Sequence, residues 1–389
     1  MTEIPLHVQR DGFDPVAGLV RLREERPVTP VQLPWGAKGW LVTRYDDVRQ
    51  VLGDAARFRN APGDDRPVLR PGQSARNGFL LHYDPPDHGT LRRMLTPEFT
   101  VRRIRRLQPR IEAIVADHLD AMEAGGNSAD LVKAFALPIP SLVICELLGV
   151  PYADREEFQR NSSIRLNLAR PMDERIAALE ASHRYMAELV AEQRKDPGED
   201  MIGMLVREHG DEIDDTELTG IADLLLIAGH ETTSNMLALG TMTLLNHPDQ
   251  ADLVRSGEHV DDAVEELLRY LAIVHTVTPR TTAEEVVLSG QRIPAGEVLL
   301  CSLPAANRDP SVAEDPDTFD LFRKVSAHMA FGHGIHHCVG APLARMEMRT
   351  AYPALLRRFP ALRLAIPFEE VPFRSYSVVY GVESLPVTW

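Results

Sequence analysis

The stretch 331–340 (F-G-H-G-I-H-H-C-V-G) gathers three glycines and three histidines around one cysteine, Cys338. Glycines at this density let a backbone adopt positive φ and approach another group closely. Cys338 also precedes a predicted helix, where the helix dipole and free N–H groups favour a thiolate over a thiol. A thiolate here has three chemical uses: a nucleophile, a zinc ligand or an axial iron ligand.

The other two cysteines predict no chemistry. Cys145 lies in an apolar run and Cys301 in a strand-like run, as is typical of buried, inert thiols. A zinc site normally needs a second pair of ligands at suitable spacing, and His336, His337 and Cys338 are consecutive, so zinc is a minor alternative. No oxyanion or base arrangement for a cysteine hydrolase is recognisable. Three widely separated cysteines favour a reducing compartment.

A second candidate site is the segment 228–233 (A-G-H-E-T-T) within a long apolar helical pattern. A buried acid and alcohol are costly unless they are satisfied or used, so Glu231 and Thr232 are candidates for a functional role. The alternative is that Thr232 bonds back to a carbonyl one turn earlier while Glu231 is solvated. From the helix alone, both interpretations stand equally.

Several cations stand near predicted element boundaries. His88 and Arg92 are four residues apart at a helix start, and Arg280 lies in the run T-P-R-T-T. Glu266 and Arg269, three apart on a predicted helix, share a face and can pair. Taken singly, His88, Arg92 and Arg280 could equally be functional cations or ordinary surface cations. The spacing of Glu266 and Arg269 is weak evidence by itself, because a surface pair shows the same spacing.

The elements that position these residues are mostly helical. Asp214 and Glu217 form a capping-box pattern that starts the long helix, which would measure about 45 Å. Apolar spacing predicts helices over 13–24, 104–122, 134–148, 175–192, 215–245, 261–271 and 341–358. Extended runs are expected in a hairpin over 31–43 and at 285–288, 298–302 and 375–389, with a long loop over 55–86. We expect one mainly α domain spanning residues 1–389 with minor sheet.

Composition narrows the class of protein. The 389 residues include 42 basic and 57 acidic side chains, a net charge of -15, which disfavours nucleic acid and anionic lipid as partners. The N-terminus lacks signal-peptide features, and the most apolar stretch, 224–228, is far too short to span a bilayer. We expect a soluble, cytoplasmic protein with no membrane anchor.

The cysteine loop resembles the haem-binding signature of the cytochrome P450 superfamily. The matching positions are Phe331, Gly332, Gly334, His336, Cys338 and Gly340. The resemblance covers essentially the whole chain, is closest to soluble actinomycete enzymes, and implies the single-domain cytochrome P450 fold with a long central helix. It implies haem b, with Cys338 as the proximal thiolate ligand of the iron and dioxygen as co-substrate.

Other residues acquire roles from the same resemblance. Glu231 and Thr232 match the acid and alcohol that relay protons to dioxygen. Glu266 and Arg269 match a structural pair near the haem. The haem propionates would be bound by His88, Arg92, Arg280 and His336. Gly89 and Thr90 depart from the usual residues after the histidine, which puts the local helix start in doubt but keeps His88 and Arg92 in register.

The resemblance also implies partners and a substrate class. Residues 92–110 carry seven arginines and one acid, and the family places this helix on the proximal side of the haem. We therefore expect a monomer that receives electrons from NAD(P)H through a ferredoxin reductase and an acidic ferredoxin. The residues expected to line the distal pocket are Leu224, Ile227, Ala228, Thr276, Val277, Val378 and the loop 61–86.

The predicted activity is hydroxylation or epoxidation of a lipophilic natural product of secondary metabolism or a xenobiotic. Dehydrogenation, coupling and peroxide-driven oxidation remain alternatives within the family. A non-catalytic haem sensor is a further alternative, although a sensor has no need for a proton relay at Glu231 and Thr232.

Overall fold

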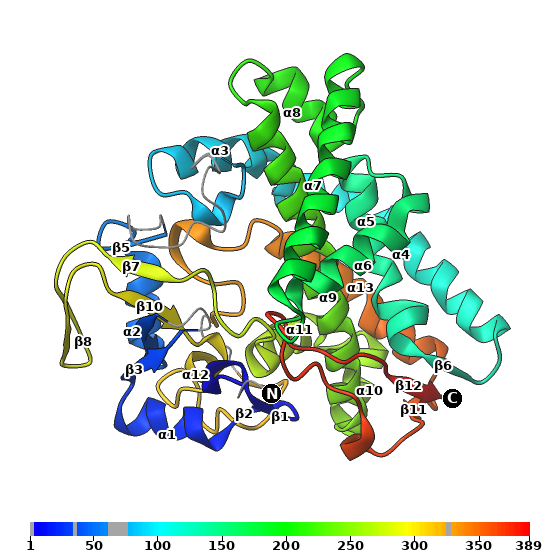
Figure 1. Cartoon of the computed structure of the whole chain (residues 1–389). Coiled ribbons are helices and arrows are strands. Elements are labelled where there is room, and N and C mark those ends of the chain that lie inside the picture. Colours follow the sequence, from blue (N-terminus) through cyan, green and yellow to red (C-terminus); the bar gives the residue numbers. More distant parts are fainter. Residues whose placement is uncertain (1–3, 34–36, 61–76, 324–327) are drawn as a thin grey trace. The chain divides into compact units, whose positions relative to one another are not determined.

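The computed structural model describes residues 4–33, 37–60, 77–323 and 328–389. Of the described residues, 57% are helical, and the sheets are small, so the predicted mainly α class with a long central helix is confirmed (Figure 1). Across these described ranges, no helix is both long enough and apolar enough to cross a membrane.

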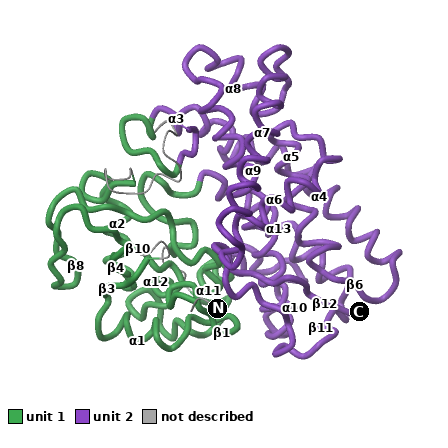
Figure 2. The backbone as a smooth tube through the Cα atoms, viewed as in Figure 1, with its two compact units in different colours: residues 1–73, 81–89, 265–338 green, residues 74–80, 90–264, 339–389 purple. Residues whose placement is uncertain are grey.

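The chain forms two compact units, each assembled from three separate stretches (Figure 2). Unit 1 comprises residues 1–73, 81–89 and 265–338, and unit 2 comprises residues 74–80, 90–264 and 339–389. The units are therefore not consecutive pieces of sequence. The expectation of one domain over residues 1–389 stays a prediction, and each unit is described by itself.

Unit 1 is built on a five-stranded sheet in the order β3-β4-β10-β7-β5. Its strands are β3 (Val28–Gln32), β4 (Lys38–Val42), β10 (Val298–Cys301), β7 (Arg280–Thr282) and β5 (Phe58–Arg59). β3 and β4 are antiparallel, which confirms the predicted hairpin, and β10 runs parallel to β4. The remaining elements within unit 1 are η1 (Leu6–Val8), β1 (Arg10–Asp11), β2 (Asp14–Pro15), α1 (Ala17–Glu25), α2 (Tyr45–Gly53), η2 (Leu80–His82, which begins at the last residue of a unit 2 stretch), β8 (Val286–Leu288), β9 (Gln291–Ile293), α12 (Leu303–Asn307) and η6 (Gly334–His336).

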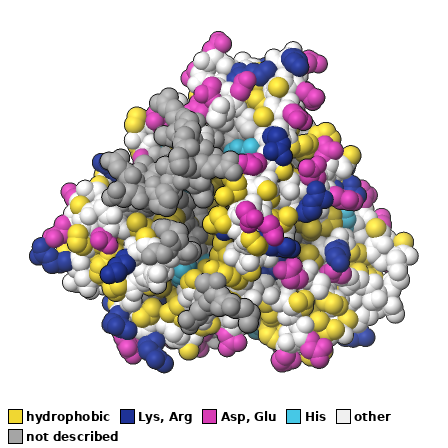
Figure 3. All heavy atoms as spheres, viewed as in Figure 1, with side chains coloured by type: hydrophobic (Ala, Val, Ile, Leu, Met, Phe, Trp, Pro, Cys, Tyr) yellow, Lys and Arg dark blue, Asp and Glu magenta, His cyan; other side chains and the backbone are white. Residues whose placement is uncertain are grey.

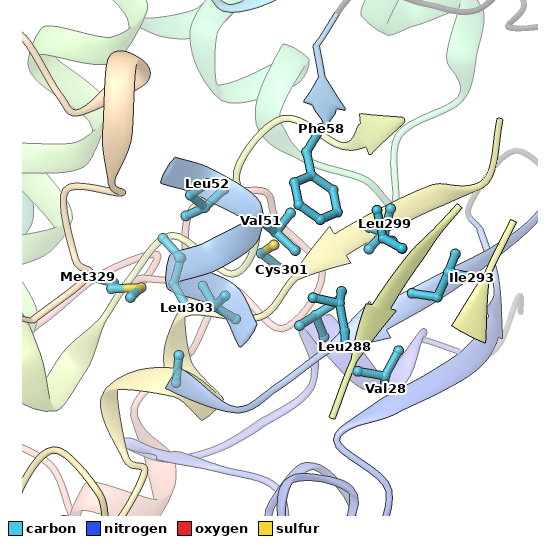
Figure 4. Close-up of a cluster of buried hydrophobic side chains, with 14 residues drawn as sticks. Val28, Val51, Leu52, Phe58, Leu288, Ile293, Leu299, Cys301, Leu303 and Met329 are labelled. Atoms are coloured by element: carbon cyan, nitrogen blue, oxygen red, sulfur yellow. The ribbon is translucent and has the colours of Figure 1, made fainter. Parts of the chain in front are cut away.

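One apolar cluster holds the sheet and α2 of unit 1 together. Val51 and Leu52 of α2 pack with Phe58, Leu299 and Cys301 from the sheet (Figure 4). Every one of these side chains is nearly inaccessible to water. Burial of this kind supplies about 25 cal/mol per Å² of apolar surface, so the cluster fixes the positions of the loops that leave the sheet.

Unit 2 is a helical body around α9 (Asp215–Leu245), which packs against α5, α7 and α13 (Figure 1). Its other helices are α4 (Val101–Ala124), α5 (Pro138–Leu148), α6 (Arg155–Leu166), α7 (Met172–Lys195), α8 (Met201–His209), α10 (Pro248–Ser256) and α13 (Ala341–Arg358). A three-stranded sheet in the order β11-β12-β6 is formed by Arg363–Leu364, Pro386–Thr388 and Ser128–Asp130. Two helices, α3 (Asp87–Leu95) and α11 (Val260–Leu271), contain residues of both units.

Helix boundaries test the sequence analysis closely. α9 and α13 have the predicted bounds, and the Asp214 side chain accepts a hydrogen bond from the Glu217 N–H at 2.7 Å, as the capping pattern requires. The single helix predicted over 134–148 is instead a π-helical turn, Val132–Ala136, followed by α5. Pro138 has no N–H to donate to the preceding turn, so the regular helix restarts there.

Two other predictions need correction. The helix predicted over 13–24 begins only at Ala17, because Asp14 and Pro15 are paired with β1. The predicted loop over 55–86 contains β5 and a 3-10 turn over Leu80–His82, and its residues 61–76 lie outside the described part of the chain.

Candidate functional site

In unit 1, the cysteine loop presents an exposed thiol on a tightly constrained backbone. The Cys338 N–H donates to the Phe331 carbonyl at 3.0 Å, which closes the loop. Gly332 and Gly334 have φ of 71° and 73°, and a Cβ at position 334 would overlap the carbonyl oxygen of Leu52. Only glycine suits this close approach, so the high glycine content of the loop has a direct geometric cause.

The other two thiols behave as the sequence predicts. Cys145 and Cys301 are both buried. Burial raises the pKa of each thiol to about 12, which keeps both protonated near neutral pH. Cys338 is therefore the one cysteine that is accessible to a ligand or reactant.

Three of the predicted cofactor residues, His88, Arg280 and His336, belong to unit 1 together with the cysteine loop, and two of them are in contact. The rings of His88 and His336 are 4.1 Å apart between centroids, and the Asn60 side-chain amide makes a short contact with His336 Nε2. Because Arg59 pairs with Thr281 in the antiparallel register of β5 and β7, the next residue, Asn60, comes opposite Arg280. The structure thus brings His88 and His336 together beside Asn60, and Arg280 lies on β7, the strand that pairs with β5.

Asn60 was missed by the sequence analysis. It follows the short strand β5, and its N–H donates to the Asp84 carboxylate at 2.9 Å. Nothing in its local sequence marks it, because its role depends on the pairing of β5 with a strand more than 200 residues away. Arg280 is itself 4% exposed and donates to the Thr278 carbonyl at 2.7 Å.

Arg92 belongs to a stretch assigned to unit 2. It lies in α3, one turn after His88, and is half-buried. The predicted register of His88 and Arg92 on one helix is confirmed, and Gly89 and Thr90 are accommodated within the helix without breaking it.

In unit 2, one face of α9 is accessible to solvent near the middle of the helix. Residues on either side are buried along most of the helix, but Ala228 is exposed and Thr232, one turn later, is half-buried. Thr232 Oγ1 donates to the Ala228 carbonyl at 2.7 Å, which is the back-bonded geometry considered above. Leu224 and Ile227 precede this opening and are 9% and 8% exposed.

Glu231 is buried, so the alternative in which it is solvated is wrong. Its side chain is 4% exposed and accepts a hydrogen bond from Arg374 Nη1 at 3.1 Å. Arg374 comes from the C-terminal segment, which lies directly on α9: a Cβ at Gly381 would overlap the Asn235 side chain. The contact joins residues 143 positions apart in the chain, and no local spacing could have predicted it.

The remaining pocket candidates fall in both units. In unit 1, Thr276 forms an isolated bridge with Ser302, and Val277 packs against the apolar cluster of the sheet. In unit 2, the Val378 N–H donates to the Leu166 carbonyl at 3.0 Å. All three are partly accessible, and their role as pocket lining stays a prediction.

The predicted pair of Glu266 and Arg269 is confirmed in unit 1. Arg269 donates from Nε and Nη2 to the two carboxylate oxygens of Glu266, both at 2.7 Å. Both residues are essentially inaccessible to water. Arg269 also donates to the carbonyls of Asn307 and Pro316, so the pair anchors the chain that leads toward the cysteine loop.

Comparison with known proteins identifies relatives of this chain. The Cytochrome P450 family model matches residues 258–368. Cytochrome P450 FAS1 of Rhodococcoides fascians is 44% identical over 395 residues, covering 100% of this chain and 99% of the relative. Among solved structures, P450 StaH from glycopeptide antibiotic A47934 biosynthesis is 46% identical with a TM-score of 0.88, and both chains are fully covered. CYP105P1 in complex with filipin I is 40% identical with a TM-score of 0.92, covering 100% of this chain and 99% of that one.

This chain belongs to the cytochrome P450 family. It is accordingly an oxidoreductase that uses haem b with dioxygen. The described residues fit that cofactor: unit 1 offers an exposed thiol as an iron ligand, and His88, Arg280 and His336 are donors suited to its carboxylates. A thiolate-ligated haem supplies dioxygen activation, with electron donation from sulfur favouring O–O cleavage.

Proposed function

We propose that this protein is a monooxygenase in which Cys338 is the proximal iron ligand. The observation that carries the proposal is the exposed thiol of Cys338 on the glycine-constrained loop, in a chain whose other two thiols are buried. His336, His88 and Arg280 would bind the propionates within unit 1, with Arg92 as a further cation. Cationic and N–H donors offset the cost of burying two carboxylates.

Replacement of the thiol tests the ligand assignment. Cys338→Ser should abolish haem incorporation or the thiolate-type spectrum of the reduced carbon monoxide complex. Cys145→Ala is the matched control, since it also removes a thiol but from an apolar site, and it should leave that spectrum unchanged. A normal thiolate spectrum in Cys338→Ser would refute the assignment.

We assign proton delivery on the distal side to Glu231 and Thr232. The open face of α9 at Ala228 and Thr232 supports this role, because it gives the Thr232 hydroxyl access to a bound reactant while Glu231 stays shielded. General acid catalysis of this kind requires a proton donor within hydrogen-bond reach, directly or through one water.

Removal of the hydroxyl should uncouple electron use from product. Thr232→Val is expected to consume NAD(P)H and release peroxide with little product. Thr241→Val is a close control, because Thr241 lies on the same helix and likewise donates to the carbonyl four residues earlier, at 2.8 Å. Full coupling in Thr232→Val would remove the residue from the relay.

The substrate class we propose is a lipophilic organic molecule, hydroxylated or epoxidised. Leu224, Ile227, Ala228, Thr276, Val277 and Val378 are mostly apolar, and apolar pockets with few polar anchors favour such ligands. The relatives from glycopeptide antibiotic biosynthesis and in complex with filipin I support a natural product. Spectral titration of the ferric protein against lipophilic metabolites would identify ligands, and labelled dioxygen would show whether oxygen enters the product or the reaction is a coupling or dehydrogenation.

For electron supply we propose an acidic ferredoxin, reduced from NAD(P)H by a ferredoxin reductase. In unit 2, a groove of about 900 Å³ between α4 and α13 supports a cationic docking surface. Its lining includes Arg105 and Glu112 of α4 and Arg345, Arg349, Arg357 and Arg358 of α13 together with apolar side chains. Of these arginines, Arg349 pairs with Asp261, and Arg358 pairs with Asp120 and Glu123. Acidic and basic side chains are interspersed on the face that Figure 3 shows, and the chain as a whole is acidic, with a net charge of -15.

Charge removal on α4 tests this partner. Arg102, Arg105 and Arg106 are exposed, and none of the described residues forms an ion pair with them, whereas Arg103 pairs with Glu98 at 2.9 Å. Neutralising the three exposed arginines should weaken ferredoxin binding and flatten its salt dependence. Neutralising three basic residues on another surface is the control. Unchanged binding and salt dependence in the α4 variant would contradict the proposal.

A further inference from the structure

The polar surroundings of Glu231 extend beyond Arg374. His230, the preceding residue on α9, is completely buried, and its Nε2 lies 3.9 Å from Glu231 Oε1. The two carboxylate oxygens therefore face different neighbours: Oε2 accepts from Arg374, and Oε1 is turned toward His230. Both neighbours belong to unit 2.

The tautomer of His230 follows from its contacts. Nδ1 lies 2.6 Å from the Leu226 carbonyl, which can only accept, so Nδ1 carries the proton. Burial lowers the pKa of His230, because desolvation disfavours the imidazolium, and the ring is neutral. Nε2 is then a lone-pair acceptor, and it has no hydrogen-bond partner among the described residues. Phe158 packs edge-on to the ring and holds its orientation.

Arg374 offers the opposite chemistry. A guanidinium donates hydrogen bonds and never accepts them, so it suits an ionised carboxylate and cannot accept the proton of a carboxylic acid. On its other side, Arg374 Nε is 3.9 Å from Glu383, whose side chain is 58% exposed. Glu231 thus lies between a donor that connects toward the surface and a buried acceptor.

We propose that His230 and Arg374 are positioning residues that hold Glu231 in its two protonation states, Arg374 receiving the carboxylate and His230 Nε2 accepting the hydrogen bond of the carboxylic acid. Interconversion of the two states forms or breaks one O–H bond, at Glu231 Oε1, with a proton taken from or returned to water, while His230 Nε2 only accepts the hydrogen bond of the acid and is not itself protonated. Closing the present 3.9 Å to a hydrogen bond needs a shift of about 1 Å. The further step, in which protonated Glu231 supplies Thr232, rests on the proposed function. The arrangement of Arg374 and His230 around Glu231 does not depend on it.

A structural experiment tests the geometry without catalysis. In Glu231→Gln the side chain is permanently neutral and carries an NH2 donor where the acid would carry its proton. A crystal structure of this variant as the haem-loaded protein should place that NH2 within about 3.2 Å of His230 Nε2. An NH2 group more than about 3.5 Å from Nε2, with no movement relative to the wild type solved in parallel, would overturn the proposal.

A kinetic experiment tests the consequence. His230→Phe keeps a ring against Phe158 but removes the acceptor, and it should lower product formed per NAD(P)H about two- to tenfold, the effect of one lost hydrogen bond. His230→Gln, which can return an acceptor near the Nε2 position, should recover much of the loss, and Thr241→Val should be unaffected. Unchanged coupling in His230→Phe, beside uncoupled Thr232→Val, would overturn the role of His230. Full coupling in both Thr232→Val and Glu231→Gln would instead refute the relay itself, while the crystallographic result would still stand or fall separately.

Discussion

Removing Arg269 should destabilise the protein far more than removing an exposed arginine from the same unit. Arg269 and Glu266 are 1% and 0% exposed, and Arg269→Ala leaves a buried carboxylate without its bidentate partner. Breaking a buried ion pair from one side typically costs about 3–5 kcal/mol. Glu266 would keep Arg323 Nε at 3.2 Å and the Asp320 N–H at 3.1 Å, so we expect the lower end, about 3 kcal/mol.

The matched control is Arg292→Ala. Arg292 pairs with Glu285 at 2.5 Å, but the two side chains are 73% and 53% exposed, and a solvated pair contributes only about 0–1 kcal/mol. Urea denaturation of the haem-loaded proteins followed by circular dichroism gives both differences. The free energy of unfolding of Arg269→Lys should lie between those of wild type and Arg269→Ala, since an ammonium keeps the charge but not the planar, bidentate guanidinium. Equal losses for Arg269→Ala and Arg292→Ala would show that the buried pair is not what anchors this region.

Three further predictions concern other described residues. Burial works against ionisation of Asp223, but hydrogen bonds from His183, Arg165 and Ser182 and the charge of Arg165 outweigh it and lower the pKa to about 2 from the usual 3.8. The stability that this carboxylate contributes is full above about pH 4 and is lost as pH falls toward 2. The difference in melting temperature between wild type and Asp223→Asn should therefore be constant from pH 7 to about 5 and narrow below about pH 4. A constant difference down to pH 3 would contradict this prediction. Gly334→Ala places a Cβ against the Leu52 carbonyl and puts an alanine at a positive φ, so it should lower haem retention on gel filtration. Gly290→Ala is the control, because its φ is also positive but the added Cβ meets no neighbour, and this variant should retain haem. Cys145 and Cys301, whose pKa values burial raises to about 12, should resist iodoacetamide in the native protein at neutral pH, and rapid labelling seen by mass spectrometry would refute their burial.

The sequence was sufficient for the parts of the molecule governed by local rules. The bounds of α9 follow from the Asp214 cap and the stop at Asn246–Pro248, and the cysteine loop is recognisable because its glycines are adjacent in the chain. Asn60 and Arg374 could not be found in this way. Each acts across a tertiary contact, 276 residues for Asn60 with His336 and 143 for Arg374 with Glu231, and a single sequence carries no signal at that range. The break in the helix at Pro138 could have been predicted locally, because proline has no N–H to donate within a helix. The apolar periodicity around it favoured one continuous helix instead.

Asp223 and Glu231, the two buried acids of α9, differ in how fully their carboxylate oxygens are hydrogen-bonded. This difference makes Asp223 a structural residue and leaves Glu231 able to change partners. Asp223 accepts from both terminal nitrogens of Arg165 at 2.7 Å and also from Ser182, with His183 3.3 Å away, so its oxygens are occupied from several directions. Glu231 accepts from one donor among the described residues, Arg374, and its second oxygen faces the acceptor atom of His230. A carboxylate can accept about four hydrogen bonds, so Asp223 is saturated while Glu231 has capacity left and a poorly matched neighbour that becomes well matched when it gains a proton. A fully bonded acid would have to break its whole network to pass a proton, and Glu231 has to release only one arginine.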